Sequence, residues 1–332
     1  MPTTAIFTPS PYVFLYDPAV TDADETRYER LIARARSGET ILIDGATGSE
    51  CTRRGVQPSD HGWSGGATLT HPEIVRSIHD DYLDIGVDFL ASNTFAAGRN
   101  IMRDVGDDAS FEQVNRQAVE LAVSARDAAG ERGRDAVVAG GISNWSFSGN
   151  HPTLDQLHAD TVAQATIMQE AGADLLSLEM MVDIERFTVT LQAAASVGLP
   201  LWVGFSVGPD LGHEPEELGE HIQLRDGGLL EDAVALAAGH GAVDAICIMH
   251  TDVRLVERSL ATVRDGWNGP LGAYAHASAI IDGEFTHDGV LTPNEYVAYL
   301  PAWQRAGATM LGGCCGIGPD HLRAMAALLA EG

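Results

Sequence analysis

The feature that most constrains the fold of this chain is an alternation, repeated eight times from residue 41 onward, of a short β-rich run and a longer segment of helical period. This alternation is typical of a parallel sheet covered by helices. Eight such units favour a closed barrel over an open doubly wound sheet, which usually has fewer strands and a switch in strand order. The expected strands are "ILIDGA" at 41, "VDFLAS" at 87, "AVVAGG" at 136, "DLLSLE" at 174, "LWVGFS" at 201, "DAICIM" at 244, "LGAYAH" at 271 and "TMLGG" at 309.

We therefore expect an α/β protein with a single (β/α)8 TIM barrel over residues 41–332 and a short N-terminal extension over residues 1–40. Between the strands, apolar residues recur every three or four positions and a glycine supplies the stop, as in "HPEIVRSIHDDYLDIG". The extension contains "FTPSPYVFLYDP" and a short polar helix, "DADETRYERLIARARSG". We expect it to cap the bottom of the barrel or to pack against its flank, and its apolar pieces offer a contact for a homo-oligomer.

Charge and cysteine content narrow the class of protein. The formal charge is −27, from 47 acidic and 20 basic residues, and the sequence contains no lysine. Nucleic-acid binding needs a basic face, so we expect no nucleic-acid partner. The sequence has no run of 18 apolar residues and no signal-peptide pattern at its start, which predicts a soluble cytoplasmic protein without a membrane partner. The four cysteines, at positions 51, 247, 314 and 315, do not form a dense disulfide framework, which favours reduced thiols.

Two of these cysteines, Cys314 and Cys315, are adjacent in a glycine-lined turn after the last expected strand. A disulfide between neighbours is strained, and the flanking glycines leave little bulk to bury two sulfurs as hydrophobes. Cys247 is expected at the end of the sixth strand, on the same catalytic face of the barrel. Three thiolates with one open position form a catalytic zinc site, so we predict that Cys247, Cys314 and Cys315 bind Zn2+. Cys51, in the loop after the first strand, is interpreted as a spare thiol.

The motifs at the strand ends resemble those of the zinc-dependent homocysteine S-methyltransferase family. The chain has "GGCCG" at 312–316, an upstream cysteine, "DGATG" at 44–48 and "YLDIGVDFLASNTF" leading to a strand end. The run "TPNEYVAYLPAWQRAGATMLGGCCG" is similar to the family's approach to its last motif. The resemblance covers residues 41–330 in order.

The resemblance implies an S-methyltransferase that moves a methyl group from a sulfonium or betaine-type donor to the thiol of L-homocysteine and gives methionine. S-methylmethionine or S-adenosylmethionine is the favoured donor, because the chain lacks two features of relatives that use other donors. These are the long C-terminal arm of betaine-using relatives and the cobalamin or folate modules of the large methionine synthases. One alternative is the same chemistry on a different thiol or selenol. Another is a non-catalytic barrel that stores zinc or senses oxidation.

Several polar residues are candidates for substrate binding. The resemblance implies that Asp44 and Glu179 anchor the amino group of homocysteine, although Asp44 has an alternative role as a turn cap. Polar residues at other strand ends complete the candidates, namely Asn93, Thr94, Ser206 and His276. His276 stands where the family usually has asparagine, and Ile246 replaces the asparagine that usually precedes the strand-six cysteine. His250 and Asp252 are candidates for a supporting role beside the metal ligands.

Overall fold

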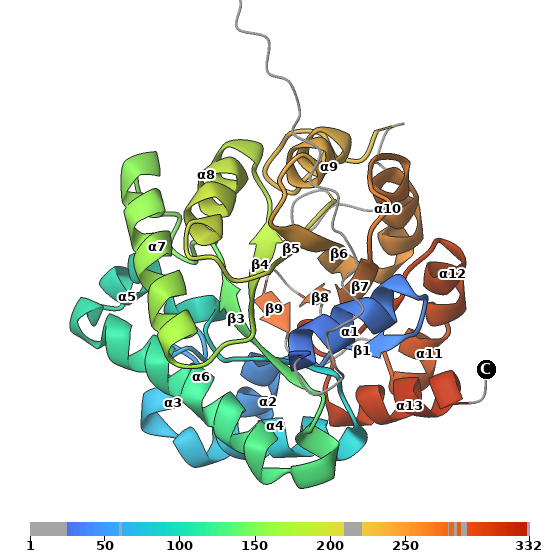
Figure 1. Cartoon of the computed structure of the whole chain (residues 1–332). Coiled ribbons are helices and arrows are strands. Elements are labelled where there is room, and N and C mark those ends of the chain that lie inside the picture. Colours follow the sequence, from blue (N-terminus) through green and yellow to red (C-terminus); the bar gives the residue numbers. More distant parts are fainter. Residues whose placement is uncertain are drawn as a thin grey trace, which may run out of the picture.

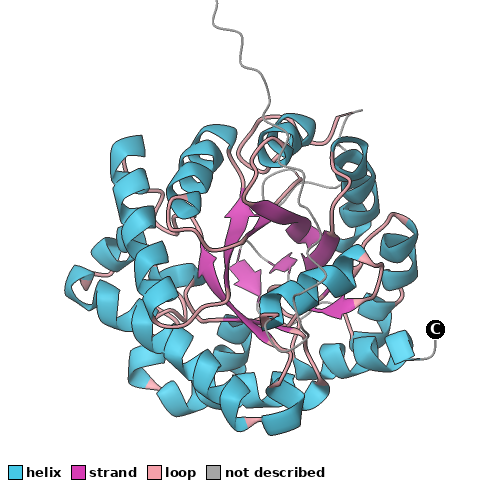
Figure 2. Ribbon diagram, in the orientation of Figure 1, coloured by secondary structure: helices cyan, strands magenta, loops and turns pink. Residues whose placement is uncertain are grey.

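The computed structural model describes residues 25–59, 62–208, 221–277, 279–281, 284–286 and 291–330. Eight parallel strands form one sheet in the order β1-β10-β7-β6-β5-β4-β3-β2. A bridge between Ile43 and Phe89 joins the first strand to the second and brings the sheet to the closure of a barrel. The predicted (β/α)8 fold is therefore confirmed, and Figures 1 and 2 show the helices arranged as a ring around the strands.

The strands coincide with the eight predicted runs. They are β1 (Ile41–Leu42), β2 (Phe89–Ala91), β3 (Val137–Ile142), β4 (Leu175–Met181), β5 (Leu201–Phe205), β6 (Val243–Asp252), β7 (Leu271–His276) and β10 (Met310–Leu311). A two-stranded antiparallel ribbon, β8 (Ala279–Ile281) and β9 (Glu284–Thr286), follows β7. The sixth strand is longer than predicted, because it continues to residue 252.

The outer ring consists of helices that pack apolar faces against the sheet. They are α2 (Thr47–Arg53), α3 (Ala67–Thr70), α4 (Pro72–Ile85), α5 (Arg99–Asp104), α6 (Phe111–Ala128), α7 (Leu154–Glu170), α8 (Ile184–Ala195), α9 (Leu230–Ala238), α10 (Val253–Gly266), α11 (Pro293–Val297), α12 (Leu300–Arg305) and α13 (Pro319–Ala330), with short 3-10 turns at Phe95–Ala97, Asp108–Ser110 and Gly130–Gly133. The predicted glycine stops are present: Gly86 ends α4 with a φ of 95°, a conformation that glycine adopts without steric cost.

Two apolar layers hold the barrel together. One lies between the sheet and the helices, and the other fills the barrel interior. Alternate residues of a strand feed the two layers. On β6, for example, Ile246 and Ile248 belong to the outer layer, whereas Cys247 and Met249 belong to the interior.

Helix α1 (Arg27–Arg36) closes the N-terminal end of the barrel. Thr26 begins the helix with a capping box to Glu29. Its apolar face joins the interior layer, and the hydroxyl of Tyr28 donates to Asp244 and accepts from the indole of Trp202. Figure 1 shows this helix lying across the centre of the ring. The prediction of a cap at the bottom is thus confirmed for this helix, whereas "FTPSPYVFLYDP" lies outside the described residues.

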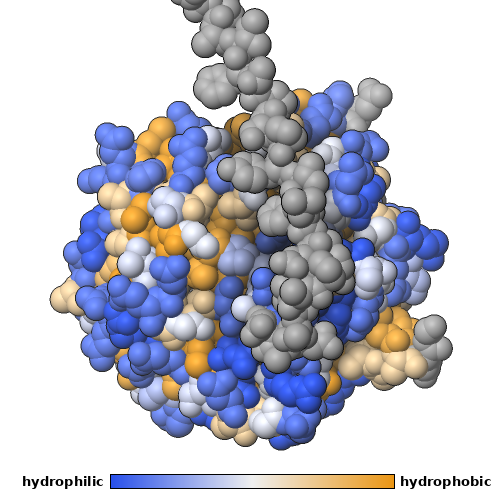
Figure 3. Space-filling view, in the orientation of Figure 1, coloured by the Kyte–Doolittle hydropathy of each residue, from blue (hydrophilic) through white to orange (hydrophobic). Residues whose placement is uncertain are grey.

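The described surface on this face is mostly hydrophilic, with apolar residues scattered among polar ones (Figure 3). Among the described residues, no helix is both long enough and apolar enough to cross a membrane.

Candidate metal centre and substrate cavity

The adjacent cysteines lie in a tight turn after β10. Close packing shapes this turn, because a Cβ atom on Gly312 would lie only 2.5 Å from the Cβ atom of Ile43. The end of β7 fixes the turn by two main-chain hydrogen bonds: Cys314 N–H donates to the carbonyl of Ala275 at 2.8 Å, and Ala277 N–H donates to the carbonyl of Cys315 at 2.9 Å. The main chain therefore holds both thiols at the C-terminal face of the barrel.

His250 reaches the same place from the end of β6. Strand alternation alone would turn this side chain outward, toward the helices. The alternation is broken because His250 has a positive φ of 42° and because the pairing with β7 shifts register between Met249 and Asp252. A left-handed conformation at a residue other than glycine costs about 1–3 kcal/mol and is concentrated at functional sites. The positive φ of His250 thus places its imidazole at the C-terminal mouth of the barrel.

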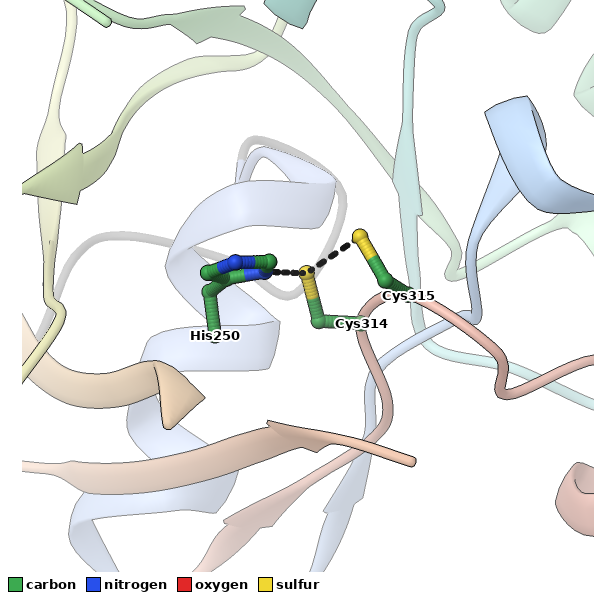
Figure 4. Close-up of side chains that lie close together, drawn as sticks. All are labelled: His250, Cys314 and Cys315. Carbon is green, nitrogen blue, oxygen red and sulfur yellow. Dashed lines mark hydrogen bonds between the residues drawn. The ribbon is translucent and has the colours of Figure 1, made fainter. Parts of the chain in front are cut away.

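The three side chains form one compact group (Figure 4). The Nδ1 atom of His250 lies 3.5 Å from the Sγ atom of Cys314, which lies 3.9 Å from the Sγ atom of Cys315. Of the described residues with metal-binding side chains, these three have ligand atoms within 4.8 Å of one another. Tetrahedral zinc with Zn–S bonds of about 2.3 Å and a Zn–N bond of about 2.1 Å separates two sulfurs by about 3.8 Å and sulfur from nitrogen by about 3.6 Å. The donor set and these two separations therefore fit zinc.

The structure does not bring Cys247 into this group, in contrast to the expected set of three thiols. Cys247 lies within β6 rather than at its end, since the strand continues for five further residues to Asp252. Its side chain is buried in the barrel interior and packs over Gly272, where an added Cβ would lie 2.5 Å from the sulfur. His250, considered above only as a supporting residue, occupies the position beside the cysteine pair.

Two other residues near the expected site, Cys51 and Asp252, make contacts that indicate a structural role. Cys51 is fully buried in the layer between sheet and helices, and burial raises the pKa of its thiol to about 11. Asp252 begins α10, where its carboxylate accepts a hydrogen bond from the main-chain N–H of Arg254 at 2.9 Å. An ion pair with the side chain of Arg254 also holds this carboxylate.

The electrostatic surroundings of His250 and Cys314 are compatible with a metal site. Burial lowers the pKa of His250 well below its usual value, so its ring is neutral and a nitrogen lone pair is available. The hydrogen bond with Cys315, followed by burial, raises the pKa of the Cys314 thiol well above its usual value. Both effects disfavour extra charge at this position, and a bound cation would reverse the effect on the Cys314 thiol.

A cavity of about 470 Å3 opens beside the cysteine pair. Three of the predicted substrate-binding residues, Asp44, Glu179 and Asn93, line it together with His250, Cys314 and Cys315. Asn93 also donates its amide to the carbonyl of Ser64 and to the hydroxyl of Thr68, both at 3.1 Å. The sequence therefore identified two acidic residues that share the cavity with the thiols.

The two carboxyl groups lie in a largely apolar environment. Burial raises the pKa of Asp44 well above its usual value, although a hydrogen bond from the N–H of Ala91 at 2.8 Å opposes the shift. Burial raises the pKa of Glu179 to about 7, against a hydrogen bond from Ser177. Neighbouring Glu179 further raises the pKa of Asp44. A cationic amino group placed between the two carboxylates would relieve their repulsion.

The other three predicted substrate-binding residues are not among the residues that line this cavity. Thr94 exchanges hydrogen bonds with the main chain of Gly141, at 2.9 and 3.0 Å. Ser206 donates to the carbonyl of Met249 at 2.9 Å and so ties β5 to the end of β6. His276 packs its ring edge-to-face against the ring of His250, with the centroids 4.8 Å apart.

An aromatic wall, which the sequence motifs did not indicate, forms another side of the cavity. It consists of Trp63, Phe95, Trp145 and Phe147. The rings of Trp63 and Phe147 have centroids 6.4 Å apart, and those of Phe95 and Phe147 are 6.5 Å apart. Residues from loops after three different strands build this wall, so no local spacing in the sequence reveals it. Aromatic faces attract cations.

Comparison with known proteins places this geometry among methyltransferases. The family model described as Homocysteine S-methyltransferase matches residues 41–329. A selenocysteine methyltransferase of Astragalus bisulcatus is 24% identical and aligns with 90% of this chain and 94% of its own length. A homocysteine S-methyltransferase of Escherichia coli is 27% identical, covering 87% of this chain and 95% of the relative.

A solved structure with a similar fold is the metallated form of the Escherichia coli homocysteine methyltransferase MmuM. It has a TM-score of 0.74 and 25% sequence identity, and the match covers 91% of this chain and all of that one (100%).

Proposed function

The chain belongs to the homocysteine S-methyltransferase family and is a methyltransferase acting on a homocysteine-type thiol or selenol; from this premise we propose that it makes methionine from L-homocysteine with Zn2+ held by His250, Cys314 and Cys315. The observation that carries the proposal is the spacing of these three ligand atoms at the wall of a cavity that also contains Asp44 and Glu179. His250 takes the place that we had expected for Cys247. Two cysteines and one histidine are a known ligand set of catalytic zinc.

The acceptor is oriented by its amino group. Asp44 and Glu179 bind the ammonium group of homocysteine, and this interaction turns its thiol toward the cysteine pair. When bound, zinc would lower the pKa of that thiol and present it as a thiolate. The buried carboxylates thus position the acceptor and the protein ligands position the metal, which is the orientation that a bimolecular reaction needs.

The donor is a sulfonium bound against the aromatic wall. Cation–π attraction to Trp63 and Phe147 favours a charged methyl donor over its neutral product. The acceptor sulfur attacks the methyl carbon in line, a new carbon–sulfur bond forms, and the old one breaks with its electron pair left on the donor sulfur. The donor becomes a neutral thioether, and the acceptor proton goes to solvent. Charge is neutralised in this step, which a low-dielectric cavity favours.

Cavity size favours S-methylmethionine over S-adenosylmethionine. A volume of about 470 Å3 lies in the lower part of the range for ligand pockets. Two amino acids side by side fit this volume more readily than an amino acid together with a nucleoside sulfonium. Because reduced cysteines are needed as ligands, we further propose a reducing compartment such as the cytoplasm.

The second candidate is methyl transfer to selenocysteine, favoured because two similar plant proteins are named for that activity. The two candidates separate in one assay. Purified zinc-loaded enzyme is incubated with 13C-labelled L-homocysteine or with L-selenocysteine, and with each of S-methylmethionine, S-adenosylmethionine and glycine betaine. Mass spectrometry should detect 13C-methionine, fastest with S-methylmethionine. Turnover of selenocysteine without turnover of homocysteine would reject the proposed acceptor.

A further inference from the structure

His276 is one of the three predicted substrate residues that do not line the cavity, and its ring packs against the ring of His250. The two rings meet edge-to-face, with centroids 4.8 Å apart and an angle of 64° between their planes. His276 ends β7, and its main chain pairs with Asp252, two residues beyond His250 on β6. His276 thus touches the proposed histidine ligand without lining the described cavity.

The end of β7 supports both halves of the proposed metal centre. This strand lies between β6 and β10 in the sheet. The neighbours of His276 hold the cysteine turn through the carbonyl of Ala275 and the N–H of Ala277. The side chain between them points to the other half, His250. Residues 275–277 therefore contact both the imidazole of His250 and the turn that carries the two thiols, and they set the separation between them.

His250 needs such support because its backbone is in a left-handed conformation that relaxes unless the surroundings fix it. Arg225 donates to its carbonyl at 3.2 Å, and the hydroxyls of Ser206 and Thr251 hold the preceding carbonyl. These contacts fix the main chain. The ring of His276, in turn, packs against the imidazole itself.

We propose that His276 is a positioning residue, whose ring holds the His250 imidazole so that Nδ1 faces Cys314. This inference rests on the metal centre of the proposed function. Residues that orient metal ligands contribute strongly to affinity, and their loss typically costs 10–100-fold in metal binding. His276 acts through ring packing and does not bind the metal.

The test measures zinc affinity by competition with a chromophoric chelator, together with the melting temperature of the metal-free protein. His276→Ala should weaken zinc binding about 10–100-fold while the metal-free protein keeps its melting temperature within a few degrees. His276→Phe keeps a ring in contact but has no ligand atom, and it should bind zinc within a few-fold of wild type. His71→Ala, at the start of α4, serves as the control histidine and should match wild type.

The outcomes are distinguishable. Equal losses in His276→Phe and His276→Ala would overturn the proposal, because they would indicate a ligand or hydrogen-bonding role. A lower melting temperature with unchanged zinc affinity would also overturn it, in favour of a merely structural role. His250→Ala tests the premise separately: if that variant binds zinc as tightly as wild type, the proposed metal centre fails, whatever His276 does.

Discussion

The Nδ1 atom of His250 lies 3.5 Å from the Sγ atom of Cys314, although the two residues are 64 positions apart in the chain. They come from the ends of strands on either side of β7, and the barrel brings them together. A third donor, the thiol of Cys315, completes the group. An imidazole and two thiolates bring one negative charge fewer than three thiolates, so the proposed metal centre should be less electron-rich than the set of three thiolates expected from the sequence.

The first prediction separates His250 from Cys247. His250→Ala should reduce zinc affinity and methyl transfer by at least tenfold, because a ligand is lost. Cys247→Ser should retain stoichiometric zinc and most activity, while the buried hydroxyl destabilises the fold by about 1–3 kcal/mol. Metal analysis and urea denaturation of both variants check this. Loss of zinc from Cys247→Ser with retention in His250→Ala would restore the set of three cysteines.

The second prediction concerns the pH dependence of amino acid binding. Because the pKa of Glu179 is raised to about 7, its carboxylate forms only as the pH rises through that value. Affinity for L-methionine, which has the amino acid group but no thiol to titrate, should therefore increase between pH 6 and pH 8. Calorimetric titration measures this, with Glu179→Gln as the weaker-binding control, in which only Asp44 remains to titrate and affinity should increase less with pH. A flat profile in wild type would contradict a role for Glu179 in binding the ammonium group.

The third prediction is a gain in stability from the same substitution. Burial favours the protonated form of Glu179. The wild-type protein therefore has its full stability only below the usual pKa of this carboxyl group, and it loses stability as the pH rises through about 7. A shift from 4.5 to about 7 corresponds to about 3 kcal/mol. Without ligands, Glu179→Gln should therefore unfold at higher urea concentration than wild type at pH 8. At pH 5 the two proteins should differ little in stability. A Glu179→Gln variant that is less stable than wild type at pH 8 would contradict this prediction.

The fourth prediction tests the helix that closes the barrel. The hydroxyl of Tyr28 donates to Asp244 at 2.8 Å and accepts from the indole N–H of Trp202 at 3.2 Å. Tyr28→Phe should leave both groups without this partner and lower the free energy of unfolding by about 1–3 kcal/mol. The turnover number should not change, because the site lies at the opposite end of the strands. Tyr299→Phe, on the outside of the barrel, is the control; a large fall in turnover for Tyr28→Phe would argue against this separation of stability and chemistry.

The fold was predictable because its determinants are local. Each strand is a short apolar run, and the longer helices have a periodic face and often end near a glycine, as at Gly86. Asp44, Glu179 and the cysteine pair were predictable for a related reason. Asp44 and the cysteine pair come shortly after β1 and β10, and Glu179 lies near the end of β4, so the strand map alone places them at the catalytic face.

The position of His250 beside the cysteine pair was not predictable from the strand map, because it depends on where β6 ends and on one backbone angle. The apolar run suggested an end near Cys247, but the strand extends to Asp252 and a positive φ turns His250 inward. One signal was present in the sequence: Ile246 precedes Cys247 where the family usually has asparagine, a mismatch at the residue chosen as the ligand. The aromatic wall had no such signal, since loops distant in sequence build it.

The most direct measurement of the central claim is zinc K-edge absorption of the purified, reduced protein with and without L-homocysteine. We predict about one zinc per chain, bonded to two sulfurs and at least one imidazole nitrogen, and a rise to three sulfurs when homocysteine is added. Three sulfurs in the absence of homocysteine would contradict the role of His250. No change on its addition would contradict the proposed acceptor.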